Sequence, residues 1–130
     1  MPRSALVAIV DDDDDIREAL SDLLLVVGLA SRAFDRAEAL LAEFEPGAFD
    51  CIVTDVKMPG ISGLQLLQRL RNLDASLPVI IITSDTDSTI RSRALEGGAH
   101  VHLEKPIEDH VLLLHLESAL AGKWKGPPNG

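Results

Sequence analysis

The chain has 130 residues, of which 46% are hydrophobic, and a formal net charge of -9 at pH 7. This length and apolar content are typical of one globular domain. The acidity argues against direct nucleic-acid binding, because that affinity comes largely from Lys and Arg neutralising phosphates.

The single cysteine, Cys51, excludes an intrachain disulfide, and its apolar surroundings predict burial. The apolar runs are too short to cross a bilayer and no signal-peptide pattern is visible, so we expect a cytoplasmic protein without membrane contact.

Five short runs rich in Val, Ile, Leu and Ala alternate with five segments of helical apolar spacing. The first and fourth runs are continuous, which is typical of parallel strands covered on both faces, whereas the weaker second and fifth suit sheet edges. The alternation predicts a parallel sheet with helices on both faces. The expected strands are residues 5–10, 30–34, 51–54, 79–83 and 101–103, and the expected helices are residues 15–27, 35–44, 62–73, 86–96 and 107–120.

Local signals mark where helices begin and where the domain ends. Asp35 is the expected N-cap of the second helix, and Ser62 with Gln65 forms a capping-box pattern before the third. Residues 122–130 are rich in Gly and Pro, so we expect a domain over residues 1–121 followed by a tail or the start of a linker. Trp124 either anchors this tail or stays unattached, and the composition favours the second interpretation.

Five consecutive aspartates stand between the first strand and the first helix. Asp11 and Asp12 follow the strand directly. Residues 13–15 open the helix, where carboxylates interact favourably with bare N–H groups, although Asp13 could also reach the outer shell of a metal. The D-x-D-x-D spacing is also that of an EF-hand loop, but Ile16 stands where that loop needs Gly, and a strand precedes it.

Polar side chains follow four of the expected strands: Asp11 with Asp12, then Asp55, Thr83 and Lys105. The carboxyl ends of parallel strands meet at one edge of a sheet, where ligands of open α/β sheets bind. Neighbouring carboxylates repel each other, and a hard divalent cation relieves that repulsion. Mg²⁺ prefers oxygen ligands, so the sequence predicts a magnesium site at this edge.

The segments I-V-D-D-D, V-T-D-V-K-M-P-G, I-I-T-S and E-K-P occur in this order at the ends of four expected strands. Together they resemble the response-regulator receiver domain of two-component signalling (the CheY-like superfamily) over about residues 4–121. The residues of these motifs are most similar to the FixJ/NarL-like branch, whose members usually carry a C-terminal helix-turn-helix domain. The implied output is therefore regulation of transcription. The resemblance implies a flavodoxin-like three-layer α/β/α fold with strand order 2-1-3-4-5 and five helices, acting as a phosphorylatable switch rather than a conventional enzyme.

Carried over by motif position, the resemblance implies that Asp55 accepts a phosphoryl group from the phosphohistidine of a sensor histidine kinase. It implies that Asp12 binds Mg²⁺ directly and Asp11 largely through water. Asp55 and the backbone carbonyl of Lys57 would complete the protein ligands. Charge neutralisation and positioning are what phosphoryl transfer needs most from a protein.

The resemblance also implies that Thr83 hydrogen-bonds the phosphoryl group as a switch residue. Lys105 would pair with the phosphoryl oxygens or with Asp55, and Pro106 would follow a cis peptide bond. Receivers commonly place Tyr or Phe three residues before this lysine, but here that residue is His102. His102 either replaces the aromatic switch, with sensitivity to pH, or is a strand-end histidine without a switching role.

In related receivers the fourth helix, fifth strand and fifth helix form a homodimer face that phosphorylation promotes. Opposite charges on the two helices fit such a two-fold contact, and a solvated face is the alternative. Four consecutive apolar residues of the last helix cannot all face one core, so at least one should face outward. The charged residues are Arg91 and Arg93 on the fourth helix and Glu108, Asp109 and Glu117 around the fifth.

Two other functions compete with the phosphorylatable switch. A flavodoxin-like electron carrier needs aromatic residues around its flavin and a phosphate-binding loop after the first strand. This chain is 3% aromatic and has five aspartates at that place, where they would repel a phosphate. A pseudo-receiver, which binds partners without phosphorylation, would not require the complete set of site residues that this chain carries.

Overall fold

The expected strands pair in one parallel sheet, and the expected helices cover its two faces. The structure is a computed structural model that describes residues 5–85, 87–124 and 126. Its elements are β1 (Leu6–Val10), α1 (Asp14–Val26), β2 (Ala30–Phe34), α2 (Ala37–Glu43), β3 (Cys51–Asp55), α3 (Gly63–Leu73), β4 (Val79–Thr83), α4 (Ser88–Glu96), β5 (Val101–Glu104) and α5 (Asp109–Leu120). The strand order is β2-β1-β3-β4-β5, which confirms the predicted flavodoxin-like arrangement and its two edge strands.

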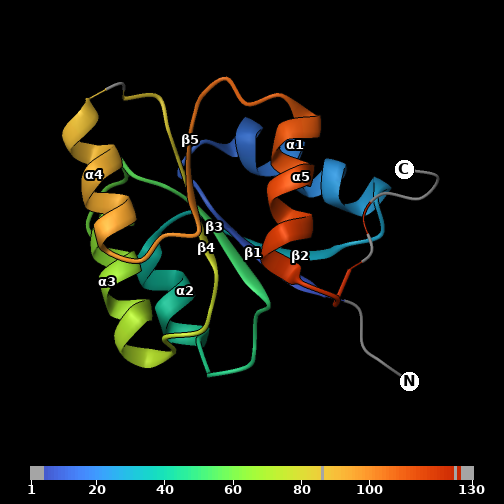
Figure 1. Cartoon of the computed structure of the whole chain (residues 1–130), viewed down its shortest axis with the longest axis horizontal. Helices are drawn as coiled ribbons and strands as arrows, with labels where there is room; N and C mark the ends of the chain where they lie inside the picture. The colour runs from blue at the N-terminus through green and yellow to red at the C-terminus, as the bar shows by residue number, and fades with distance from the viewer. Residues whose placement is uncertain (1–4, 86, 125, 127–130) are drawn as a thin grey trace.

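Three helices, α2, α3 and α4, cover one face of the sheet, and α1 and α5 cover the other (Figure 1). Residues of β1, β3 and β4 alternate between two apolar cores, one on each face. For example, Ala8 packs on the side of the three helices and Ile9 on the side of the two. Because these strands are buried on both faces, their sequences are continuous apolar runs. Within the described ranges, no helix is both long and apolar enough to cross a membrane.

Helices α2 and α5 each begin two residues later than the spacing predicts. The prediction of Asp35 as a cap is wrong: α2 begins at Ala37 with Arg36 at the N-cap, and the Asp35 carboxylate pairs instead with the Arg36 guanidinium at 3.0 Å. Helix α5 begins at Asp109, whereas Ile107 packs against the core from the preceding loop. Its apolar side chain therefore fits the helical spacing although it lies outside the helix.

Side chains cap α1, α3 and α4. Asp13 accepts hydrogen bonds from first-turn N–H groups of α1, the nearer at 2.9 Å, so the acidic run opens this helix as predicted. Ser62 and Gln65 form the reciprocal contacts of the predicted capping box at α3. Asp87 caps α4, and residue 86, the expected start of that helix, lies outside the described residues.

The segment after α5 packs on the domain, contrary to the interpretation that its composition favoured. The Trp124 side chain is buried, and its Nε1–H donates a hydrogen bond of 3.1 Å to the Val27 carbonyl. Composition does not show this, because the contact joins the chain's last segment to the end of α1. Residues 1–4 of the expected domain, and residues 125 and 127–130 of the expected tail, lie outside the described residues.

Cys51 lies in the central strand β3 with none of its surface exposed, which confirms its predicted burial. Burial raises the pKa of its thiol to about 12. The thiolate is the reactive form of cysteine, so this side chain acts as a small apolar core residue.

We predict that Gly63→Ala destabilises the domain by about 3 kcal/mol, because α3 begins in contact with the backbone of β3. A Cβ at residue 63 would lie 2.0 Å from the carbonyl oxygen of Asp55, so the helix would have to move away. Urea unfolding followed by circular dichroism measures the change. Gly28→Ala is the matched control: it has a positive φ but open space, and should cost about 1 kcal/mol. Equal costs would contradict the close approach of α3.

Candidate functional site

Three aspartates meet at the carboxyl edge of the sheet. Asp11 and Asp12 directly follow β1, and Asp55 ends the neighbouring strand β3. One carboxylate oxygen of each lies within 4.8 Å of those of the other two. Asp11 and Asp55 are buried, whereas Asp12 is exposed. The structure therefore brings together the three carboxylates that the sequence identifies as candidate metal ligands.

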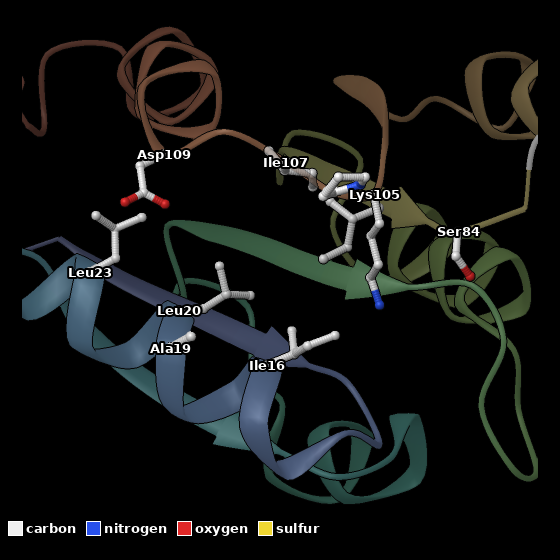
Figure 2. Close-up of a pocket in the computed structure, with 10 residues that line it drawn as sticks. Ile16, Ala19, Leu20, Leu23, Ser84, Lys105, Ile107 and Asp109 are labelled. Carbon is white, nitrogen blue, oxygen red and sulfur yellow. The ribbon is translucent and has the colours of Figure 1, made fainter.

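Lys105 connects the two buried carboxylates. Its Nζ lies 3.1 Å from Asp11 Oδ2 and 3.3 Å from Asp55 Oδ2. Figure 2 shows the Lys105 side chain extending from the end of β5 toward the end of β3. Burial opposes the charged amine, but the hydrogen bond to Asp11 and the attraction of both carboxylates outweigh it and raise the pKa of Lys105. Lys105 is therefore held as a cation against both carboxylates.

The surroundings of Asp55 oppose ionisation of its carboxyl group. Burial raises the pKa of Asp55, and the negative charge of Asp11 acts in the same direction. Lys105 opposes this shift, as does the backbone N–H of Val56, which donates to Asp55 Oδ1 at 2.8 Å. The rise in pKa shows that these contacts do not fully compensate for burial, so an additional cation would stabilise the charged form.

The oxygens at this edge fit the ligand preference of Mg²⁺. All three side chains are carboxylates, which are hard donors, and their charge exceeds that of the single ammonium group of Lys105. Asp12 is exposed, so solvent reaches the cluster. The expected role of the Lys57 carbonyl stays a prediction.

Backbone groups and one arginine support Asp11 from α1. The N–H of Asp13 donates to Asp11 Oδ1 at 2.9 Å, and Arg17 Nη1 donates to the Asp11 carbonyl at 2.7 Å. The sequence indicated no such role for Arg17, because its target is a backbone atom. The start of α1 thus orients the buried carboxylate that Lys105 contacts.

Thr83 is buried at the end of β4, and its hydroxyl contacts the next loop. Thr83 Oγ1 accepts a hydrogen bond from the Asp85 N–H at 3.0 Å. The Asp85 carboxylate in turn pairs with Lys57 Nζ at 3.0 Å, which joins the loops that follow β3 and β4. Sequence reasoning did not identify Asp85, since this partner lies far away in the chain and no local pattern marks the pair.

His102 lies on β5 and faces the side of the sheet that α4 covers. Its neighbours Val101 and Leu103 pack with the core on the α1 and α5 side, and strand side chains alternate between faces. The His102 Nε2 atom is buried, with no hydrogen-bond partner among the described residues. The alternation thus places this imidazole on the face of the sheet that α4 covers, and its switching role stays a prediction.

An apolar groove of about 500 Å³ adjoins Lys105 between α1 and the start of α5 (Figure 2). Ile16 and Leu20 project into it from α1, and Ile107 closes the opposite side. Ser84 and Lys105 also line the groove, and the Lys105 amine contacts Asp11 and Asp55. A macromolecule that reaches the carboxyl edge of the sheet therefore meets an apolar surface beside the charged site.

Residues 7–117 match the family model of the response regulator receiver domain. The chain belongs to this family, a class of signalling switches, and this confirms the resemblance of its motifs. It is 42% identical to the transcriptional regulatory protein FixJ of Azorhizobium caulinodans, over 92% of this chain and 57% of that protein. It is 39% identical to nodulation protein W of Bradyrhizobium diazoefficiens, over 84% of this chain and 48% of that protein. The chain thus spans about half the length of the curated relatives it matches.

Solved receiver structures have the same fold. The crystal structure of FixJ-N superposes with a TM-score of 0.82 at 36% identity, covering 92% of this chain and 96% of that one. The BeF3-activated DrrB receiver domain gives a TM-score of 0.84 at 27% identity, covering 91% of this chain and 98% of that one. These similarities agree with membership of the response-regulator receiver family.

We predict that Asp55→Asn stabilises the metal-free domain at pH 7. The folded-state pKa of Asp55 is raised above its ordinary value of 3.8, so the charged carboxylate weakens folding at neutral pH. That penalty disappears as the pH falls through the folded-state pKa toward the unfolded value. The gain over the wild type should therefore shrink between pH 7 and about pH 4, measured by urea unfolding in EDTA.

The matched control is Asp22→Asn, which replaces an exposed aspartate on α1 and should change the free energy of unfolding by less than about 0.5 kcal/mol. A lower stability of Asp55→Asn at pH 7 would show that the Asp55 carboxylate is not destabilised by its surroundings.

Proposed function

We propose that this domain accepts a phosphoryl group on Asp55 from the phosphohistidine of a sensor histidine kinase. Mg²⁺ would be held by Asp11, Asp12, Asp55 and the backbone carbonyl of Lys57. The observation that carries the proposal is the convergence of three carboxylates and the Lys105 ammonium group at one edge of the sheet. Membership of the receiver family supports the same function.

In this mechanism the Asp55 carboxylate is the nucleophile. Its oxygen forms the new bond to phosphorus as the phosphorus–nitrogen bond of the phosphohistidine breaks, and the histidine of the kinase is the leaving group. The hydrogen bond from the Val56 N–H at 2.8 Å sets the orientation of that carboxylate. Lys105, 3.3 Å from Asp55 Oδ2, offsets negative charge on the incoming phosphoryl oxygens. Mg²⁺ held by Asp11, Asp12, Asp55 and the Lys57 carbonyl would supply further positive charge to offset the negative charge of the phosphoryl group. The same groups would assist hydrolysis of the aspartyl phosphate.

Thr83 is the proposed link between the site and the surface. A hydroxyl can accept and donate at once, so the contact with the Asp85 N–H leaves the Thr83 O–H able to donate to a phosphoryl oxygen. A shift of Thr83 toward that oxygen would move Asp85 and the loop that leads into α4. This would shift an existing equilibrium of the α4–β5–α5 face, with His102 as the proposed second switch residue on β5.

The output that we propose is control of a partner or an effector domain in transcription regulation. The relatives named transcriptional regulatory protein FixJ are about twice as long as the region that this chain matches. The cytoplasm is the proposed compartment, because transcription regulators act there in bacteria. The kinase that donates the phosphoryl group would approach the carboxyl edge, where the apolar groove adjoins Lys105.

The proposed partner of the phosphorylated domain is a second copy, bound through the α4–β5–α5 face. Leu112 of α5 is buried, whereas Leu114 is 64% exposed, which confirms that the apolar run of α5 does not face one core. Arg91 and Arg93 are exposed on α4, so each copy could place basic residues against acidic residues of the other. The exposed acidic residues around α5 are Glu108, Asp109 and Glu117.

We predict that incubation with Mg²⁺ and acetyl phosphate adds one phosphoryl group to the wild-type chain and none to Asp55→Asn. Intact-mass spectrometry measures the adduct. An adduct on Asp55→Asn would contradict the assignment of the acceptor. No adduct on the wild type would favour a pseudo-receiver that binds partners without phosphorylation.

The five consecutive aspartates should separate into two groups by function. Asp12→Ala should abolish the Mg²⁺-dependent adduct, since Asp12 belongs to the carboxylate cluster. Asp14→Ala is the matched control in the first turn of α1, and its phosphorylation rate should stay within about twofold of the wild type. Rates from a time course of intact mass measure both effects. Equal losses in the two variants would contradict this division of the acidic run.

We predict that beryllofluoride with Mg²⁺ increases the apparent mass of the wild type in light scattering, and that Leu114→Asp prevents the increase. Leu114 is exposed in the single chain, so the substitution should spare folding while placing a charge in the contact. Leu73→Asp, at a 51% exposed leucine of α3, is the matched control and should still associate. An unchanged mass of the wild type would contradict the proposed dimer face.

A further inference from the structure

The chain reverses direction directly after α5. Ala121 and Gly122 both adopt left-handed backbone conformations, with φ of 34° and 92°. The Ala121 N–H donates to the Glu117 carbonyl at 3.2 Å, and the Lys123 N–H donates to the Leu120 carbonyl at 2.9 Å. This turn ends α5 and directs the next residues back toward α1. A left-handed conformation has a steric cost for alanine but not for glycine, so other contacts must hold Ala121 in it.

Trp124 supplies the largest of these contacts. Its side chain is only 9% exposed and packs in the core between the sheet and the α1 and α5 layer. The indole Nε1–H donates to the Val27 carbonyl at 3.1 Å. Val27 is the C-cap residue of α1, where carbonyl groups lack partners within the helix. The indole therefore satisfies both its own buried donor and an acceptor at the end of α1.

Lys123 connects the same segment to the sheet. Its Nζ lies 3.1 Å from Oδ1 of Asp50, whose side chain is 5% exposed. Asp50 Oδ2 accepts a hydrogen bond of 2.8 Å from the Leu6 N–H. Asp50 stands just before β3 and Leu6 begins β1, so both belong to the amino edge of the sheet. Because the Lys123 side chain is exposed, this ion pair contributes little to stability. The ion pair nevertheless shows where the chain runs after α5.

We infer that residues 121–124 form a strap that locks the end of α1 to the amino edge of the sheet. The strap is part of the folded domain, so the predicted boundary after residue 121 moves to a point after Trp124. It also places Trp124 at the edge of the sheet opposite Asp55. If Asp55 is phosphorylated as proposed above, the modified group lies at the opposite edge of the sheet from Trp124, so we expect the Trp124 contacts to persist.

Trp124 is the only tryptophan, so its fluorescence tests the strap directly. In the native chain its emission should be blue-shifted, and acrylamide should quench it several-fold less than in the chain unfolded in urea. Trp124→Phe keeps the ring but removes the donor, and should raise the unfolding equilibrium constant about tenfold. Trp124→Ala should raise it by more than about a hundredfold. Native quenching as strong as in urea, or unchanged stability of both variants, would overturn the strap.

Ala121→Gly provides a test that does not remove a contact. If the strap holds Ala121 in the left-handed conformation, glycine should relieve the steric cost and raise the midpoint of urea unfolding. Ser118→Gly, at an exposed position inside α5, is the matched control and should lower that midpoint. A lowered midpoint for both variants would show that residue 121 is not held in the left-handed conformation.

Addition of Mg²⁺ and beryllofluoride separates the strap from the proposed function. Fluorine NMR reports binding at Asp55, and Trp124 emission reports the strap. Bound fluoride with unchanged emission supports a strap that is independent of the switch, whereas a shifted emission overturns that independence. Absence of bound fluoride would contradict the proposed phosphorylation site, and the quenching and stability experiments would still test the strap.

Discussion

The repulsion between buried carboxylates is the constraint on which this domain depends. Asp11 and Asp55 end neighbouring strands, and each is removed from most of the water that would screen its charge. Lys105 offsets part of the repulsion from 3.1 and 3.3 Å, yet burial still raises the pKa of Asp55. Such a site attracts additional positive charge. That property suits the phosphoryl transfer to Asp55 that we propose.

Much of the fold serves to hold these charges at fixed positions. The start of α1 orients Asp11 through Arg17, and α3 begins where only a glycine, Gly63, fits against the Asp55 carbonyl. The Thr83 hydroxyl is tied by Asp85 to the loop that leads into α4. The site is thus mechanically connected to the surface that we propose as its output. The strap that we infer for residues 121–124 lies at the other edge, where Trp124 contacts the end of α1.

Local chemistry explains which features were predictable from the sequence. Parallel strands buried on both faces must be apolar throughout, so their positions and the sheet that they form could be derived from the pattern. The capping box of Ser62 and Gln65 was equally predictable, because both partners lie within one turn. The Asp35 cap was predicted wrongly, since a neighbouring guanidinium competed for the carboxylate. The burial of Trp124 could not be derived from a segment whose composition is that of a linker.

The sequence by itself determined the fold class, the family and the set of polar residues at the strand ends, because these depend on periodicity and on short motifs. Only the tertiary structure decided which of these residues touch. The contacts of Lys105 with Asp11, of Lys57 with Asp85, and of Trp124 with Val27 all join distant parts of the chain. Such pairs depend on how strands and loops meet in space, and no local spacing encodes them. The burial that raises the pKa of Asp55 is likewise a property of the packed molecule.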